Sequence, residues 1–205
     1  MSEAKVKNLI LDFGGVLIDL DKARCVARFQ ALGMADVEQL LDVCHQQGFL
    51  NLYEEGRMDD DEFRQHIRRH LGRPATDDEI DSAWNSFLDG IPLYKLDYLD
   101  ELRSRYASVC LLSNTNNLHW QYACRYDFTA RGRTVDDYFD RIFLSYRMKL
   151  AKPDPEIFRR VLDETGFRAA ETLFVDDSEA NCRAARGLGL HTYTPQARED
   201  WRGRL

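Results

Sequence analysis

Short apolar runs recur along the chain at intervals that predict the strands of a buried sheet. The first run, residues 9–11, ends at Asp12, and similar runs occupy residues 107–114, 140–145 and 172–178, with a weaker one at 190–194. Helix-like segments separate the later runs from one another. Strands that are apolar on both faces and alternate with helices are typical of a parallel sheet covered on both sides. The pattern therefore predicts an α/β fold.

Between residues about 20 and 90 the periodicity changes from that of strands to that of helices. Apolar positions recur at helical spacing in the segments 25–33, 37–44, 61–72 and 78–88. Gly90 and Pro92 then mark the return to strand-like sequence. We therefore predict a Rossmann-like core of residues 1–19 and 91–205, with a mostly parallel sheet and helices on both faces. A small all-helical cap at residues 20–90 interrupts this core.

Composition and charge narrow the class of protein. The chain of 205 residues is 44% hydrophobic, which suffices for one folded domain or one domain with a sizeable insert. Its formal net charge of −7 argues against nucleic-acid binding, because duplex binding needs a clustered excess of Lys and Arg. The first eight residues are too polar, and the apolar run after them is too short, for a signal peptide or a membrane span. We therefore expect a cytoplasmic protein without nucleic-acid or membrane partners, and no feature sets its oligomeric state.

The cysteines predict neither disulfides nor a zinc site. They are odd in number, widely spaced and without a C-x-x-C pair, which is typical of reduced, partly buried thiols. The five are Cys25, Cys44, Cys110, Cys124 and Cys182.

Polar side chains are predicted to gather at the carboxyl edge of the sheet, where ligands of such folds bind. Asp12 ends the first strand and is followed by Phe13, Gly14 and Gly15, which let the backbone turn sharply and bring its amides close to a ligand. The polar residues that follow the later strands are Ser113, Asn114, Lys152, Asp176 and Asp177. Each has an ordinary explanation when taken alone, as a turn residue, a solvated lysine or an acid at a helix N-terminus. Together they favour a shared site.

The chemistry that requires this set is phosphoryl transfer. Asp12 would attack phosphorus, and Asp176 with Asp177 would form the end of the site that binds a divalent cation. Such an oxygen-only site suits Mg²⁺. Ser113 would donate a hydrogen bond to the phosphate, while Lys152 would hold both the nucleophile and the transferring group.

The segments "DFGGV", "LLSN", "AKPDPEIF" and "FVDDSEAN", in this order, resemble the four motifs of the haloacid dehalogenase superfamily over nearly the whole chain. The resemblance implies hydrolysis of a small phosphorylated metabolite with Mg²⁺, through an aspartyl-phosphate. It implies Asp12 as nucleophile and metal ligand, the Gly14 carbonyl as a further ligand, Ser113 and Asn114 as phosphate contacts, Lys152 as the motif lysine, Asp177 as the direct metal ligand and Asp176 as its partner. Residues 20–90 resemble the family's helical cap, and "LYEEGRMDDDEF" resembles its substrate-side turn and the helix after it. For Asp59, Asp60 and Asp61 we favour the simpler role of acids at a helix N-terminus.

One position departs from the common pattern of that superfamily. Most of its phosphatases have a second aspartate two residues after the nucleophile as general acid and base, and this chain has Gly14 there. A glycine at that position, together with "SNTNNLH", resembles the α-D-glucose-1-phosphate phosphatase group. Without that acid, esters with good leaving groups should be favoured, so we expect a preference for sugar 1-phosphates. His119, one turn beyond the second motif, is a candidate to face the site.

Three other functions stay open at this level. A metal-independent 2-haloacid dehalogenase-like hydrolase would use Asp12 on carbon, but the pair Asp176 and Asp177 speaks against it. Phosphonate cleavage would need a cap lysine, and residues 23–94 contain none. A phosphate-binding regulatory module without turnover is the non-enzymatic alternative, because a fold alone does not establish an activity.

Overall fold

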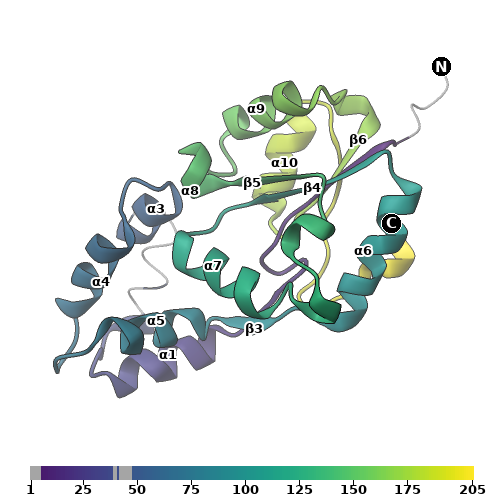
Figure 1. Cartoon of the computed structure of the whole chain (residues 1–205). Helices are drawn as coiled ribbons and strands as arrows, with labels where there is room; N and C mark the ends of the chain where they lie inside the picture. Colours follow the sequence, from purple (N-terminus) through teal and green to yellow (C-terminus); the bar gives the residue numbers. More distant parts are fainter. Residues whose placement is uncertain (1–5, 39–40, 42–47) are drawn as a thin grey trace.

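A five-stranded parallel sheet forms the centre of the molecule (Figure 1). The computed structural model describes residues 6–38, 41 and 48–205. The strand order is β5-β4-β1-β6-β7, and every neighbouring pair is parallel. The strands are β1 (Asn8–Leu11), β4 (Ser108–Ser113), β5 (Arg141–Leu144), β6 (Thr172–Val175) and β7 (His191–Tyr193). The predicted α/β fold is confirmed, and each strand lies within or at an apolar run identified in the sequence.

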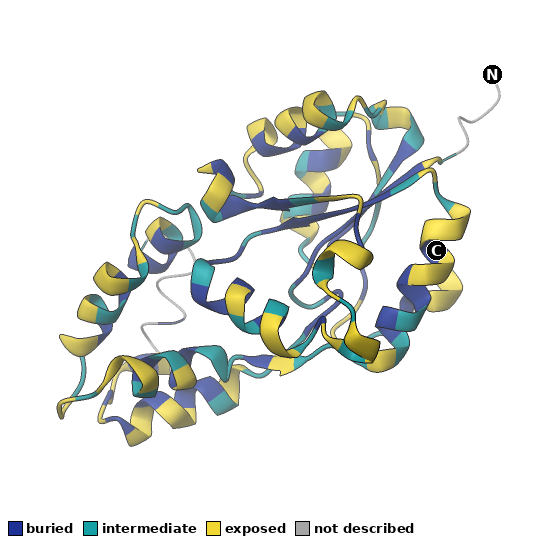
Figure 2. Cartoon of the chain, viewed as in Figure 1, coloured by how far each residue is buried: buried dark blue, intermediate teal, exposed yellow. Residues whose placement is uncertain are grey.

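Helices cover both faces of this sheet because alternate strand residues point to opposite sides. Leu9 and Leu11 of β1 pack in one apolar cluster with α6 (Leu93–Arg105) and α7 (Asn117–Tyr126). Ile10, between them, packs in another cluster with α9 (Pro155–Thr165) and α10 (Glu179–Gly187). Figure 2 shows the result, with buried strands between helices whose outer faces are exposed. The short helices are α8 (Ser145–Met148) and the 3-10 turns η1 (Ala130–Gly132), η2 (Val135–Asp137), η3 (Ala169–Glu171) and η4 (Trp201–Arg204).

A separate group of helices lies beside the carboxyl edge of the sheet, as the predicted cap. It consists of α1 (Lys22–Ala31), α3 (Phe49–Glu54), α4 (Asp60–Arg68) and α5 (Asp77–Asn85), which bury their own apolar cluster. Capping boxes that pair Asp59 with Glu62 and Thr76 with Glu79 fix the starts of α4 and α5. Of the predicted helical segment 37–44, residues 39–40 and 42–44 lie outside the described residues, and so does His45.

The cap is not all-helical, which corrects the prediction for residues 20–90. An antiparallel ribbon of β2 (Asp19–Leu20) and β3 (Leu88–Gly90) joins it to the core. The chain passes from core to cap in β2 and returns in β3, and the two strands run side by side. Their pairing satisfies backbone N–H and C=O groups that would otherwise need other partners. Strands of two and three residues are too short to show an alternating pattern in the sequence. A buried ion pair of 3.0 Å between Lys95 and Asp19 ties this ribbon to α6.

Among the described residues, no helix has the length and apolar character required to cross a membrane. The described cysteines are free thiols, and three of them, Cys25, Cys110 and Cys182, are buried.

Candidate active site

Asp12 lies in a cavity of about 760 Å³ between the core and the cap. The strand continues through its amide, which donates to the Val175 carbonyl at 2.8 Å, and then the backbone turns. Gly15 has a φ of 72°, and a Cβ there would lie 2.1 Å from Oδ2 of Asp177, so only glycine allows the two loops this close. Gly14 is less restricted, because a Cβ there would meet only the Leu20 side chain, at 3.6 Å.

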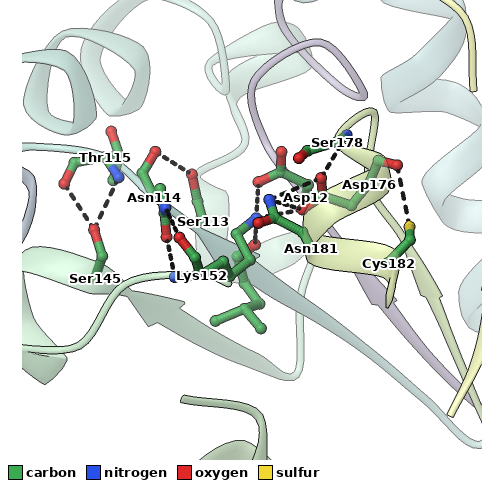
Figure 3. Close-up of polar contacts among 11 residues, drawn as sticks. Asp12, Ser113, Asn114, Thr115, Ser145, Lys152, Asp176, Ser178, Asn181 and Cys182 are labelled. Carbon is green, nitrogen blue, oxygen red and sulfur yellow. Dashed lines mark hydrogen bonds and ion pairs between the residues drawn. The ribbon is translucent and has the colours of Figure 1, made fainter. Parts of the chain in front are cut away.

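Lys152 is the centre of the buried polar network at the end of this cavity (Figure 3). Its Nζ donates to Asp12 Oδ1 at 2.7 Å, to Asp176 Oδ2 at 2.6 Å and to the Leu112 carbonyl at 3.0 Å. Burial alone would lower the pKa of Lys152, but the two carboxylates outweigh burial and raise it. The ammonium group is therefore permanently charged, and it holds the proposed nucleophile in a fixed position.

The two acids after β6 have different surroundings. Asp176 is fully buried, and its carboxylate accepts from Lys152, from the Ser178 amide at 2.8 Å and from Asn181 Nδ2 at 3.0 and 3.1 Å. Asp177 is exposed and lines the cavity. One oxygen each of Asp12, Asp176 and Asp177 lie within 4.8 Å of one another. Asp177 is therefore the better placed to bind a cation directly, while Asp176 orients Lys152.

The acid cluster fits Mg²⁺ by its chemistry. Although Asp177 is exposed, partial desolvation in the cavity and the neighbouring Asp176 raise its pKa above the usual value. Burial, opposed by Lys152, raises the pKa of Asp12 to about 8. Crowded carboxylates that resist ionisation are stabilised by a hard divalent cation, for which they supply oxygen ligands. Asp12, Asp177 and the Gly14 carbonyl would hold the ion.

The residues after β4 divide into two roles. The Asn114 side chain brackets the backbone of Lys152, because its Nδ2 donates to the Lys152 carbonyl and its Oδ1 accepts from the Lys152 amide, both at 2.8 Å. Ser113 is fully buried, and its hydroxyl donates to the Asn114 carbonyl at 3.3 Å. Asn114 and Thr115 line the cavity. The phosphate-binding roles of Ser113 and Asn114 stay predictions, and positioning of Lys152 is a role of Asn114 that the sequence did not indicate.

His119 lines the cavity but is fully engaged by its neighbours. Its Nε2 lies 3.1 Å from the Trp84 carbonyl, so it donates there, and its Nδ1 lies 3.2 Å from Asn116 Nδ2 and accepts. The ring also stacks on Trp84 with centroids 4.4 Å apart. Burial lowers the pKa of His119 to about 4. His119 is therefore a neutral residue that joins cap and core, and it has no free proton for a leaving group.

The pH dependence of stability should reveal this buried histidine. A His whose pKa falls from 6.5 to about 4 on folding stabilises the fold above pH 6.5, and this contribution is lost as pH falls toward 4. The loss should reach about 3 kcal/mol at pH 4. We expect the free energy of unfolding, measured by urea titration, to fall more steeply between pH 7 and 4 in the wild type than in His119→Gln. Equal slopes in the two proteins would show that His119 is protonated in the folded state.

The cap is held over the cavity by contacts to α7 and α8. The Ser145 hydroxyl donates to the Glu54 carbonyl at 2.6 Å, and Lys149 donates to the Gly56 carbonyl. Asp60 accepts from Tyr53 at 2.6 Å and from Asn117 Nδ2 at 2.7 Å. Asp60 stands in the first turn of α4, as predicted, and these contacts give it a second role. It bridges cap and core, and sequence spacing carries no signal for such a contact.

Two further residues of the site were not identified from the sequence. Asn181, in the first turn of α10, donates to both carboxylate oxygens of Asp176. It ends the segment "FVDDSEAN", so its place in that motif was an available signal. Glu54 of the cap also lines the cavity, and nothing in the sequence distinguishes it from Glu55 beside it.

Comparison with known proteins gives consistent matches over nearly the whole chain. The family model of haloacid dehalogenase-like hydrolases matches residues 6–189. A D-ribitol-5-phosphate phosphatase of Bacteroides thetaiotaomicron is 40% identical over 200 residues, which cover 98% of this chain and 97% of the relative. A crystal structure of a wild-type HAD family enzyme of the same organism, in complex with magnesium and inorganic phosphate, aligns with a TM-score of 0.91 and 48% identity over 96% of this chain and 97% of that one. A predicted HAD-like hydrolase of Porphyromonas gingivalis aligns with a TM-score of 0.88 and 39% identity, covering 97% of this chain and 95% of that chain.

Proposed function

Since the chain belongs to the haloacid dehalogenase-like hydrolases, we propose that it is a Mg²⁺-dependent phosphatase that hydrolyses a small polyhydroxylated phosphate ester through an aspartyl-phosphate at Asp12. The observation that carries this proposal is the position of Lys152 Nζ, 2.7 Å from Asp12 and 2.6 Å from Asp176 in a cap-covered cavity. Such a lysine fixes the nucleophile and neutralises charge on the phosphoryl group as it is transferred.

The roles follow from the contacts of each group. Asp12 attacks phosphorus, and the hydrogen bond from Lys152 holds the Asp12 carboxylate in a fixed position in the cavity. Asn114 holds the backbone of Lys152, and Asn181 holds Asp176 in the orientation that pairs with the lysine. Mg²⁺ supplies charge neutralisation for the phosphoryl oxygens when it is bound. The buried network keeps these groups in place before the substrate enters, so little reorganisation is needed at reaction.

The alternatives are less consistent with these observations. A metal-independent dehalogenase has no use for three carboxylate oxygens within 4.8 Å of one another. Phosphonate cleavage lacks its cap lysine in residues 23–94. A binding module without turnover would not need a lysine that touches the nucleophile, and the similar enzyme from Bacteroides binds both magnesium and inorganic phosphate.

For the substrate we place D-ribitol 5-phosphate first. The relative with that activity aligns over 98% of this chain, and the cap wall of the cavity offers amide and carboxyl groups from Asn51, Glu54 and Glu55 that suit hydroxyl groups. Apolar parts of that wall include Leu50 and Trp84. The sugar 1-phosphate preference rests on Gly14 and on the segment "SNTNNLH", without a relative of that activity, so we place α-D-glucose 1-phosphate second.

Phosphate release tests this assignment. With Mg²⁺ we expect purified protein to hydrolyse D-ribitol 5-phosphate with a higher kcat/KM than α-D-glucose 1-phosphate, and to hydrolyse p-nitrophenyl phosphate as well. Excess EDTA should reduce all three rates by about 10²-fold or more, since the ion supplies several kcal/mol of charge stabilisation. Mg²⁺ should also raise the Tm, because it binds only the folded acid cluster. Activity that EDTA does not change would contradict the proposed metal dependence, and lack of activity on all three esters would contradict the phosphatase.

A further inference from the structure

Among the described core residues, the positions at which a proton donor for the leaving group was expected do not supply one. Gly14 carries no side chain, His119 is neutral and bonded at both ring nitrogens, and Lys152 is committed to Asp12 and Asp176. An ester of a primary alcohol departs as a strongly basic alkoxide, so a positioned acid matters for it. The cavity has to supply that acid from elsewhere.

Glu54 is brought to the cavity by the cap and held there by the core. It is the last residue of α3, and its carbonyl accepts from the Ser145 hydroxyl at 2.6 Å. The hydroxyl of the preceding residue, Tyr53, donates to Asp60 and accepts from the Leu118 amide at 3.3 Å. The backbone of Glu54 is therefore fixed to the core, while its carboxyl group lines the same cavity as Asp12 and Lys152.

The surroundings of Glu54 let it exist in both protonation states. Burial raises its pKa to about 7, and the charge of Lys152 opposes this increase. On the cap side, Asp60 of α4 is bonded to Tyr53, and Lys149 after α8 is bonded to the Gly56 carbonyl. The other titratable or charged groups that line the cavity are Asp12, Lys22, Glu55, His119, Asp154 and Asp177. A general acid and base should have a pKa near the working pH, and Glu54 meets this condition.

We propose that Glu54 is the general acid and base of the reaction and takes the place of the missing acid at position 14. This inference rests on the proposed phosphatase function. In the first step Asp12 forms a bond to phosphorus, the bond from phosphorus to the ester oxygen breaks, and that oxygen takes the bonding electron pair and the Glu54 proton. In the second step water attacks the aspartyl-phosphate, Glu54 takes a proton from the water, and the bond from phosphorus to Asp12 breaks. Inorganic phosphate leaves, and both carboxyl groups return to their initial states.

Dependence on the leaving group separates this role from a binding role. In Glu54→Gln we expect kcat/KM for D-ribitol 5-phosphate to fall about 10²-fold, because the departing alkoxide loses its proton donor. The kcat/KM of p-nitrophenyl phosphate should change little, because this ratio reports only the steps up to the aspartyl-phosphate and the nitrophenolate leaving group needs no proton. We expect wild-type activity on D-ribitol 5-phosphate to decrease above about pH 7, where Glu54 loses its proton. This decrease should be absent from Glu54→Gln. Asp61→Asn removes one negative charge from an exposed part of the cap and should leave both rates unchanged.

Restoring the acid at the position where related phosphatases have it provides an independent variant. Gly14→Asp is sterically possible, since a Cβ there has only one van der Waals contact, at 3.6 Å. We expect the double variant Glu54→Gln with Gly14→Asp to regain activity on D-ribitol 5-phosphate that Glu54→Gln alone lacks. Equal losses of kcat/KM on D-ribitol 5-phosphate and p-nitrophenyl phosphate in Glu54→Gln would overturn the inference and make Glu54 a binding contact. A raised KM with unchanged kcat would do the same. A wild type inactive on D-ribitol 5-phosphate, α-D-glucose 1-phosphate and p-nitrophenyl phosphate would instead refute the phosphatase function itself.

Discussion

Asp12→Asn should reduce Mg²⁺-dependent phosphatase activity on the order of 10⁴-fold or more, the scale seen when a covalent nucleophile is removed. An amide cannot form the aspartyl-phosphate, and it also replaces a charged metal ligand with a neutral one. The substitution is nearly isosteric, and Lys152 keeps its bonds to Asp176 and to the Leu112 carbonyl. The measurement is phosphate release from D-ribitol 5-phosphate by wild type and variant at equal protein concentration.

Thermal unfolding provides the control for this variant. Burial and the neighbouring Asp176 and Asp177, opposed by Lys152, raise the pKa of Asp12, so ionisation of Asp12 in the folded state without metal costs stability. The cost begins above the ordinary pKa near 3.8 and grows as pH rises toward 8. Asn removes it, so the Tm in EDTA at pH 7 should be unchanged or higher, while the increase in Tm on addition of Mg²⁺ should become smaller. Substantial remaining activity in a folded variant would exclude the covalent mechanism.

Lys152→Met should reduce both activity and stability. We expect activity to fall on the order of 10³-fold, because the donor that neutralises transition-state charge is removed. Asp12 and Asp176 then share a buried site without their counter-charge, which should lower the free energy of unfolding by about 3 kcal/mol. Urea unfolding and phosphate release, measured on the same preparation, separate the two effects.

Two further variants test whether these effects are specific to the Lys152 side chain. Lys152→Arg keeps the charge but not the compact geometry, so it should recover more stability than activity. Lys7→Met removes an exposed lysine paired with Glu171 at 3.0 Å and should change stability by no more than about 0.5 kcal/mol. A Lys152→Met protein that unfolds more easily yet keeps wild-type activity when folded would show that the lysine is only structural.

The sequence predicted those parts of the fold that depend on the local pattern of apolar and turn residues. Continuous apolar runs identified the strands, and turn residues such as Gly90 identified the return from the cap. Asp12, Lys152 and Asp177 were placed correctly at one edge because the carboxyl ends of parallel strands lie together. These conclusions need only periodicity and the order of segments along the chain.

The parts that escaped prediction depend on contacts between segments far apart in sequence. Asp60 reads as an acid at a helix start, and its bond to Asn117 exists only after the cap docks on α7. His119 lines the cavity as the sequence suggested, but the contacts of its two ring nitrogens with Trp84 and Asn116 could not be predicted. Glu54 lies in the segment that resembles the substrate-side turn of the cap, but its place in the same cavity as Lys152 comes only from docking of the cap on the core.

The ribbon of β2 and β3 has a consequence for how this architecture diversifies. Asp19 pairs with Gly90 and Leu20 with Leu88, so the chain leaves the core and re-enters it at adjacent points. An inserted segment whose two ends lie side by side distorts the surrounding domain little, whatever the length of the insertion. The strand that carries Asp12 is therefore insulated from changes in the cap. Exchange of the intervening helices, by evolution or by design, would change which ester is accepted and which cap residue serves as the acid, while Asp12 and Lys152 stay in place.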